Sequence, residues 1–278
     1  MGCQIDTQGW DLLLLRSWPP PESSPADVGL AFEDLRIPTA DGRELAAWFV
    51  PALSGNPRGT VLFHTGAEGN IGRYLSTLPW AAESDFNLLI YDYQGFGASD
   101  GEPNFRNFEP DAHAVVNYLL SRPEPSAHVL IHLGGSLGSL PALSTAAAYP
   151  DETVGVVIYG GFFPEQVGGL WLETFVCPLL APLGYLSGLV WAGNLPDFVN
   201  PHIAIPHIQD PFFVVIPEDD TIVPVEAQTN FFAALPEPKE LYWAQGDHSP
   251  NAIEDDPGMG IAILQWANQL DGLLPAEP

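Results

Sequence analysis

The sequence contains very few basic residues. Eight Lys and Arg oppose 35 Asp and Glu in 278 residues, which gives a formal net charge of −27. A surface this acidic repels phosphate backbones and anionic lipid headgroups, so neither nucleic acid nor an electrostatically bound membrane is an expected partner. The only lysine, Lys239, follows no Gly-rich loop, which excludes a P-loop nucleotide site.

Cysteine is equally scarce. Cys3 and Cys177 lie far apart and form neither a disulfide framework nor a zinc-binding pattern. The first residues lack a basic segment and contain only four consecutive leucines, which is not typical of a secretory signal. Gly2 would suit N-myristoylation, but Asp6 stands where Ser or Thr is required. We therefore expect a soluble, cytoplasmic protein.

Apolar residues, in contrast, are abundant enough for a large core. They make up 46% of the chain, whereas charged residues make up only 15%. Short apolar runs alternate with helix-length segments, a pattern typical of a buried, mostly parallel sheet covered by helices on both faces. The expected strands are Phe32–Ile37, Glu44–Val50, Thr60–His64, Asn87–Asp92, His128–Leu133, Val154–Tyr159, Phe212–Ile216 and Glu240–Trp243. The expected helices are Ile71–Glu83, Phe108–Ser121, Leu137–Tyr149, Val225–Leu235 and Gly258–Leu270.

The pattern indicates one α/β domain over residues 31–272. Residues 1–30 are rich in proline and serine and are expected to form a leader or strap, and residues 273–278 form a short tail. Asp41-Gly42 predicts a hairpin turn between the first two strands, which would add antiparallel strands at one edge of the sheet.

One interval interrupts the alternation of strands and helices. Between Tyr159 and Phe212, the segment Thr174–Pro196 carries no charge and is long enough to cross a bilayer. It contains three prolines and three glycines, and a span would put two parts of one sheet on opposite sides of a membrane. We expect no stable span but an apolar cap over a pocket, inserted at about 161–207. A pair of core helices is the alternative.

The strongest motif follows the strand His128–Leu133. Gly134-Gly135-Ser136-Leu137-Gly138 is a G-x-S-x-G sequence between a strand and a helix, where it forms a sharp turn that exposes the serine at the edge of the sheet. Small residues two positions before and after the serine relieve the clash between strand and helix. Ser136 is therefore the expected nucleophile, rather than part of a structural Gly-Ser turn.

A catalytic serine in this setting needs a base and an acid later in the chain. His248 follows the last strand directly, whereas His202 and His207 lie in a Pro-rich segment and are more typical of packed or surface histidines. The orienting acid is expected after Phe212–Ile216, where Glu218, Asp219 and Asp220 are adjacent. Chemistry alone does not separate these three; Asp220 is favoured by its spacing from the proline at the next helix start.

An oxyanion needs two N–H donors. One is expected from Leu137, directly after the nucleophile at the start of a helix. The other is expected from the loop His64–Asn70, where Gly66 and Ala67 are both candidates.

The chain resembles the α/β-hydrolases, specifically their compact serine-aminopeptidase-like and prolyl-oligopeptidase-like branch. Over roughly residues 31–272, the likeness rests on the triad motifs, the loop His64–Asn70, and the run Asp92–Gly101 (DYQGFGASDG), which is similar to a family hallmark. The family loop commonly reads H-G-N-A-G-N, whereas here Thr65 follows the histidine and the loop is one residue longer. This departure leaves the oxyanion amide open.

Two other departures are Ile216-Pro217 before the acid, where His-Gly is common, and Ser139 in place of a glycine. Neither changes the triad. The resemblance implies an α/β-hydrolase fold, with an eight-stranded, mostly parallel sheet, helices on both faces and a small apolar cap after the sixth strand. It also implies acyl transfer to Ser136 with no metal or organic cofactor.

The expected substrate is a small-molecule ester with an apolar acyl or alcohol group. Aromatic residues of the predicted cap, among them Trp171, Phe175 and Trp191, would bind it. An amidase or peptidase, and a thioesterase, remain alternatives within the same fold. A non-catalytic binding homologue is the alternative from another class, and the oligomeric state is not predicted.

Overall fold

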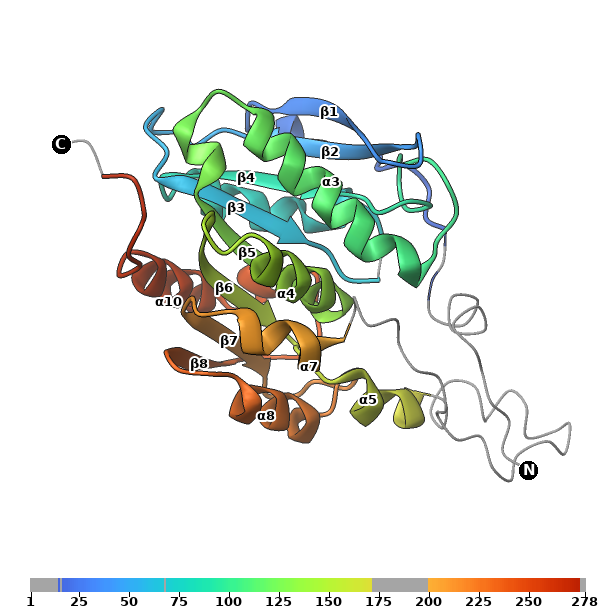
Figure 1. Cartoon of the computed structure of the whole chain (residues 1–278), viewed down its shortest axis with the longest axis vertical. Coiled ribbons are helices and arrows are strands. Elements are labelled where there is room, and N and C mark those ends of the chain that lie inside the picture. The colour runs from blue at the N-terminus through green and yellow to red at the C-terminus, as the bar shows by residue number, and fades with distance from the viewer. Residues whose placement is uncertain (1–14, 16, 68, 172–199, 276–278) are drawn as a thin grey trace, which may run out of the picture.

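A single sheet organises the computed structural model, which describes residues 15, 17–67, 69–171 and 200–275 (Figure 1). Within these residues the eight strands are β1 (Glu33–Pro38), β2 (Glu44–Val50), β3 (Gly59–His64), β4 (Phe86–Tyr91), β5 (Leu130–Gly135), β6 (Thr153–Tyr159), β7 (Phe212–Pro217) and β8 (Lys239–Ala244). Their order is β1-β2-β4-β3-β5-β6-β7-β8. Strands β3 to β8 are mutually parallel, whereas β2 runs antiparallel to both of its neighbours, β1 and β4. The predicted mostly parallel sheet with an antiparallel edge is confirmed.

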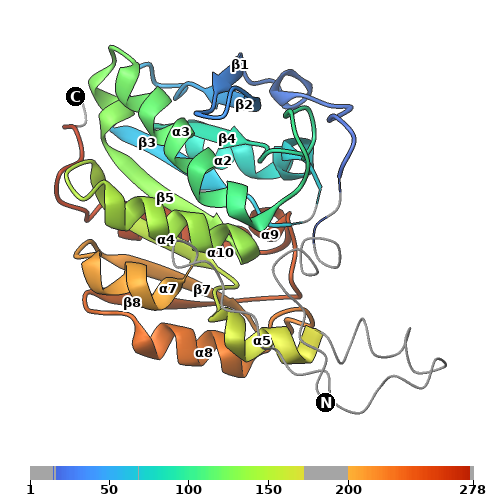
Figure 2. The same cartoon turned by 45° about the vertical axis from the view of Figure 1, so that its right-hand side comes forward.

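Helices cover both faces of the sheet (Figures 1 and 2). One face carries α3 (Phe108–Ser121), α4 (Ser139–Ala148) and α8 (Val225–Ala234), and the other carries α2 (Leu78–Ala82) and α10 (Pro257–Ala267). The remaining described helices are η1 (Pro25–Val28), η2 (Ile71–Thr77), η3 (Phe105–Asn107), η4 (Pro125–His128), η5 (Ser136–Gly138), α5 (Pro164–Trp171), α7 (Pro201–Ala204), η9 (Ile205–His207) and α9 (Ala252–Asp255).

Two predicted helices differ from the structure at their N-terminal ends. The segment expected as one helix from Ile71 to Glu83 is a 3-10 stretch, η2, followed by the short helix α2. Pro79 lies in the first turn of α2, where it lacks an N–H to continue the preceding helix but fits a new helix start. The helix after the elbow likewise begins with one 3-10 turn, η5, before α4.

Side chains of each central strand alternate between the two faces. In β4, Leu88 and Ile90 pack with α2 and α10, whereas Leu89 and Tyr91 pack with α3. Because the strands from β3 to β8 are parallel, their carboxyl ends meet at one edge of the sheet, which is where open α/β sheets place their sites.

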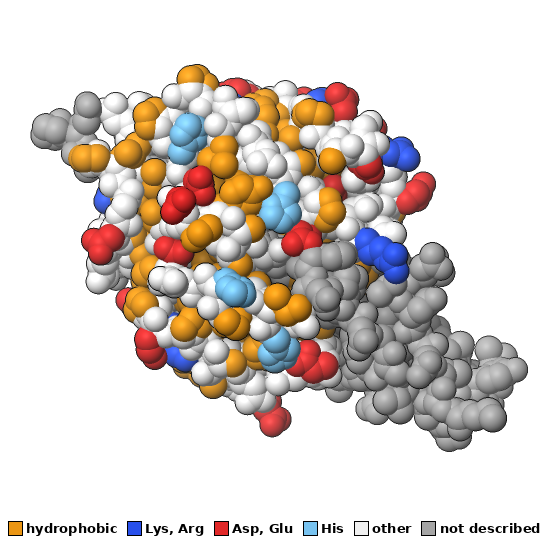
Figure 3. Space-filling model, in the orientation of Figure 1, with side chains coloured by type: hydrophobic (Ala, Val, Ile, Leu, Met, Phe, Trp, Pro, Cys, Tyr) orange, Lys and Arg blue, Asp and Glu red, His pale blue; other side chains and the backbone are white. Residues whose placement is uncertain are grey.

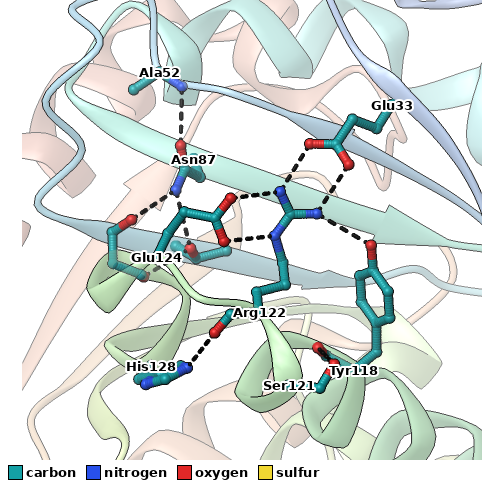
Figure 4. A network of polar contacts seen from close by, with 10 residues as sticks. Glu33, Ala52, Asn87, Tyr118, Ser121, Arg122, Glu124 and His128 are labelled. Carbon is teal, nitrogen blue, oxygen red and sulfur yellow. Dashed lines mark hydrogen bonds and ion pairs between the residues drawn. The ribbon is translucent and has the colours of Figure 1, made fainter.

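Arg122, just after α3, links the C-terminal end of that helix to the start of β1 (Figure 4). Its guanidinium contacts both carboxylate oxygens of Glu33, at 3.0 and 2.8 Å, and both of Glu124, at 3.2 and 3.0 Å. It also lies 4.0 Å from the ring centroid of Phe49. The hydrogen bonds to the two carboxylates raise the pKa of Arg122, so the guanidinium stays charged and these hydrogen bonds are charge-assisted.

The proposed division into leader, domain and tail stays a prediction. Within residues 1–30, the described part packs on the domain, because Leu15 and Leu30 are buried and Trp18 lies against the same core as α3. The interval expected to form the cap contains α5, α7 and η9.

The uncharged segment Thr174–Pro196, with Phe175 and Trp191, lies outside the described residues, and Trp171 is the last residue of α5. No helix among the described residues is long and apolar enough to cross a membrane. The cap and its aromatic lining therefore stay predictions.

Candidate active site

Ser136 follows β5 directly and has a backbone φ of 54°. Among the described non-glycine residues only Asp85 shares a positive φ, a conformation that L-residues rarely adopt. The two flanking glycines make this turn sterically feasible. A Cβ on Gly134 would lie 2.7 Å from the carbonyl oxygen of Gly138, and a Cβ on Gly138 would lie 2.0 Å from that of His64. The motif thus has the geometry expected of a strand–elbow–helix turn.

Asp220 lies in the loop after β7, and its carboxylate is enclosed by hydrogen-bond donors. Oδ1 accepts from the N–H groups of Ile222, at 2.9 Å, and Val223, at 2.7 Å. Oδ2 accepts from Nε2 of Gln228, at 2.8 Å, and lies 2.8 Å from Nδ1 of His248. The Asp220 side chain is fully buried, and its contact with Nδ1 fixes the orientation of the His248 ring.

The other two acids of this loop are arranged differently. Glu218 and Asp219 are exposed, and only their main-chain N–H groups have hydrogen bonds to other described residues. The structure therefore pairs His248 with Asp220, the acid that the spacing favoured.

His248 lies at the same sheet edge as Ser136. Its ring is 5.8 Å from the ring of Tyr159, the last residue of β6, and a Cβ on Gly160 would lie 2.8 Å from its Cε1 atom. Tyr159 is the registered partner of Gly135, which directly precedes Ser136. The three predicted triad residues thus follow β5, β7 and β8, parallel strands whose carboxyl ends share one edge of the sheet.

Two residues that sequence reasoning did not single out support the loop that carries His248. The Asp247 carboxylate accepts hydrogen bonds from the N–H of Thr221 and of His248, both at 2.7 Å. The Tyr159 hydroxyl donates to the carbonyl of Asp247, at 3.2 Å, and accepts from the N–H of Ser249, at 3.1 Å. The N–H groups of Thr221 and His248 hold the pKa of the Asp247 carboxyl below its usual value, with Thr221 having the larger effect.

The loop after β3 lies beside the elbow. A Cβ on Gly66 would be only 3.3 Å from Cβ of Ser136, so the loop and the serine are in close approach. The N–H of Gly66 donates to the hydroxyl of Tyr74, at 3.2 Å. The N–H of Ala67 has no partner among the described residues, and Leu137 lies in the first turn of η5, where N–H groups lack intrahelical partners. Of the two candidates in this loop, Ala67 is the one whose N–H has no partner in the part of the chain that the structure describes.

The remaining histidines are engaged elsewhere. His202 stacks on Phe163, with ring centroids 4.1 Å apart, and its Nε2 lies 2.7 Å from Oε1 of Glu165, while His207 is exposed. These two are the surface and packed histidines that the sequence predicted. Among the described residues, no group of three or more His, Cys, Asp or Glu is placed to hold a metal ion.

His64 and His132 form a buried chain under the sheet edge. Nδ1 of His64 lies 2.8 Å from the Tyr91 hydroxyl, and its Nε2 lies 3.2 Å from Nδ1 of His132. The His132 ring also contacts two hydroxyls, that of Thr145 through Nδ1 and that of Thr153 through Nε2. Burial lowers the pKa of His132 to about 3 and that of His64 well below its usual value. Both rings are therefore neutral hydrogen-bonding groups of the core.

Comparison with known proteins agrees with this geometry. The family model described as "Serine aminopeptidase, S33" matches residues 55–188. The chain is similar to the uncharacterized protein YfhR of Escherichia coli K12, with 24% identity over 230 residues, covering 81% of this chain and 76% of that protein. It is also similar to a yeast protein named as the uncharacterized membrane protein YNL320W, with 26% identity over 235 residues, covering 84% and 78%.

Solved structures share the fold at low identity. The Pyrococcus furiosus esterase Pf2001 superposes with a TM-score of 0.71 and 19% identity, covering 93% of this chain and 100% of that one. The esterase domain of a Rhodothermus marinus protein superposes with a TM-score of 0.65 and 22% identity, covering 87% and 100%. The sheet order, the elbow and these likenesses together show that the chain has an α/β-hydrolase fold. Its similarity to the S33 serine aminopeptidases covers residues 55–188, just under half of the chain.

Proposed function

We propose that this protein is a serine hydrolase that cleaves carboxylic esters through an acyl-enzyme on Ser136. The observation that carries the proposal is the pairing of His248 with the buried Asp220 at the sheet edge where Ser136 occupies a left-handed elbow. In the neutral imidazole, a carboxylate that accepts from the Nδ1–H keeps the proton on that nitrogen, so the lone pair of Nε2 is available to a general base.

In the proposed reaction, the Ser136 hydroxyl attacks the ester carbonyl carbon and its proton passes to Nε2 of His248. Asp220 stabilises the imidazolium that results. The N–H groups of Leu137 and Ala67 stabilise the oxyanion of the tetrahedral intermediate. This intermediate collapses, and the alcohol leaves with the proton from His248. Water, deprotonated by the same histidine, then hydrolyses the acyl-enzyme. No step calls for a metal or an organic cofactor.

The apolar nature of the substrate is inferred from the predicted cap. That interval carries only Glu165 and Glu173 as acids before Asp197, and it has no basic residue to bind the phosphates of a coenzyme A thioester. Glu165 is already paired with His202. The two structural neighbours named above as an esterase and an esterase domain support the same assignment.

A peptidase is the second candidate, because the matching family model is named for serine aminopeptidases. An aminopeptidase binds the free amine of its substrate through acids near the mouth of the site. The scarcity of such acids in the cap interval favours an esterase over a peptidase. Hydrolysis of aminoacyl naphthylamides at rates above those of matched esters would reverse this choice.

The proposal is tested with p-nitrophenyl esters of increasing acyl length. Ser136→Ala and His248→Ala should each leave only the roughly 10³–10⁴-fold acceleration over water that binding and oxyanion donors supply. A fluorophosphonate should add its mass to Ser136 in the parent protein and not in folded Ser136→Ala. Ser136→Ala with more than a few per cent of parent activity would contradict the elbow assignment. A protein with no turnover and no labelling would be a non-catalytic homologue.

The apolar cap is tested by acyl-chain preference. Each CH₂ that is buried should improve kcat/KM by about fourfold, which corresponds to roughly 0.8 kcal/mol. Trp191→Ala should erase much of that gain and leave acetate hydrolysis nearly unchanged. A flat chain-length profile in the parent would remove the cap and the apolar substrate from the proposal, with the triad unaffected.

A further inference from the structure

The segment before β1, expected from the sequence as part of a leader, lies against the loop after β3. In both cartoon views this segment, coloured dark blue, runs down the right-hand side of the molecule (Figures 1 and 2). The indole Nε1 of Trp18 donates to the carbonyl of Ala67, at 3.3 Å, and Nδ2 of Asn70 donates to the carbonyl of Pro19, at 2.8 Å. We call residues 15–21, without residue 16, the strap.

Further contacts extend this interface beyond Asn70, into the 3-10 stretch η2. A Cβ on Gly72 would lie 2.7 Å from Cβ of Pro21, so the strap passes directly over that glycine. The guanidinium of Arg73 lies 5.9 Å from the ring centroid of Trp18. At its other end the strap is anchored by Leu15, which is buried in the core beside α3. The strap is therefore fixed at one end by the core and at the other by the loop.

Trp18 contacts the part of this loop that has least other support. Gly66 is held by the Tyr74 hydroxyl, and Ile71 donates its N–H to Oδ1 of Asp92, at 2.8 Å. Between these two anchors, the Trp18 indole is the only hydrogen-bond partner that Ala67 has among the described residues. An indole N–H that fixes the Ala67 carbonyl restricts rotation about the same residue's backbone, and so restricts where its own N–H points.

We propose that Trp18 is a positioning residue that orients the Ala67 amide for oxyanion stabilisation. This inference rests on the proposed function. The strap is then part of the catalytic apparatus without touching substrate, because a hydrogen-bond donor to an oxyanion is effective only when it is aligned before the charge develops. The indole N–H performs this role as an uncharged donor, so Trp18 itself brings no charge to the loop.

Trp18→Phe tests the proposal, because it keeps an aromatic body in the strap and removes only the indole N–H. We expect kcat to fall about tenfold, less than the loss of an oxyanion donor itself, with KM changed by less than twofold. An alkyl trifluoromethyl ketone, which adds the Ser136 hydroxyl and leaves an oxyanion on the former carbonyl, should lose affinity by about the same factor as kcat/KM.

Two further variants make the result specific. Asn70→Asp keeps the oxygen that accepts from the Gly72 N–H but loses the amide that donates to Pro19, and it should lower kcat in the same direction. Trp243→Phe is the matched control, since Trp243 is 43% exposed on β8 and its indole has no hydrogen bond among the described residues. It should leave kcat and inhibitor affinity unchanged.

The outcomes are separable. A parent protein without ester turnover overturns the proposed function, and this inference with it. An active parent with kcat and ketone affinity unchanged in Trp18→Phe overturns this inference alone. A lowered melting temperature with unchanged kcat would likewise contradict it, because the strap would then be purely structural.

Discussion

The carboxylate of Asp247 accepts two hydrogen bonds from Thr221, one from its main-chain N–H at 2.7 Å and one from its hydroxyl at 2.8 Å. Thr221 directly follows the acid Asp220, and Asp247 directly precedes His248. The contact therefore joins the loop after β7 to the loop after β8, one residue away from the Asp220–His248 hydrogen bond. Two loops that could move independently are thus held at one separation.

Asp247→Asn is expected to lower kcat about tenfold, because loss of the charge weakens the hydrogen bonds that the Thr221 and His248 N–H groups donate to this side chain and loosens the contact between the two loops. The measurement is steady-state kinetics with a p-nitrophenyl ester, with the fold checked by circular dichroism. Asp219→Asn is the matched control, since it removes the charge of an exposed neighbour without breaking a side-chain bond to another described residue. Equal effects of the two changes would mean that only local charge matters.

Asp220→Asn should reduce kcat on the order of 10⁴, as expected when the histidine is left in the wrong tautomer. Glu218→Gln and Asp219→Asn should each reduce it by less than about tenfold, because neither side chain contacts the imidazole. The same kinetic assay measures all three. A large loss at Asp219 with little at Asp220 would show that the acid lies one position earlier.

Gly138→Ala should destabilise the fold by about 3 kcal/mol, because its Cβ would meet the His64 carbonyl oxygen at 2.0 Å and backbone cannot easily yield. Gly135→Ala, in the same motif, should change the free energy of unfolding by less than about 1 kcal/mol, since the nearest atom to its Cβ is 3.8 Å away. Urea unfolding measures both. Similar losses at the two glycines would contradict the elbow geometry.

Stability should fall as pH rises from 5 to 8, because two carboxyl groups are buried. Burial raises the pKa of Asp92 and of Asp111 to about 7, from the ordinary value of 3.8. The folded state therefore binds more protons than the unfolded chain between these values. Each contribution is fully present below about pH 4, is lost progressively as the pH rises to about 7, at up to about 1.4 kcal/mol per pH unit, and is absent above that.

Asp111→Asn should flatten this dependence in urea unfolding at pH 5, 6, 7 and 8. The variant removes the titrating group, so any remaining slope comes from Asp92 and the other carboxylates. Asp34→Asn, an exposed change on β1, should leave the slope as it is in the parent. An unchanged slope in Asp111→Asn would show that this carboxyl is ionised in the folded protein at pH 5.

Local patterns were sufficient for the strands and for the elbow. Near-continuous Val, Ile and Leu runs identify buried parallel strands, and Gly134 and Gly138 mark the turn because no side chain fits there. Chain order then points to His248, since only three histidines follow Ser136 and one of them follows a strand directly. Helix ends were less predictable, as at Pro79, where a 3-10 stretch and a new helix replace one continuous helix.

The tertiary structure decided what depended on contacts between segments distant in the sequence. Glu218, Asp219 and Asp220 are chemically alike, and only packing against Gln228 and His248 distinguishes the buried acid. Likewise, only the structure shows that the Gly66 N–H donates to the Tyr74 hydroxyl, which is why we propose the Ala67 N–H as the oxyanion donor. The contact between Trp18 and Ala67 spans 49 positions, and no local pattern encodes it. The sequence by itself therefore determined which chemistry the chain can carry, whereas three-dimensional packing decided which atoms are placed to perform it.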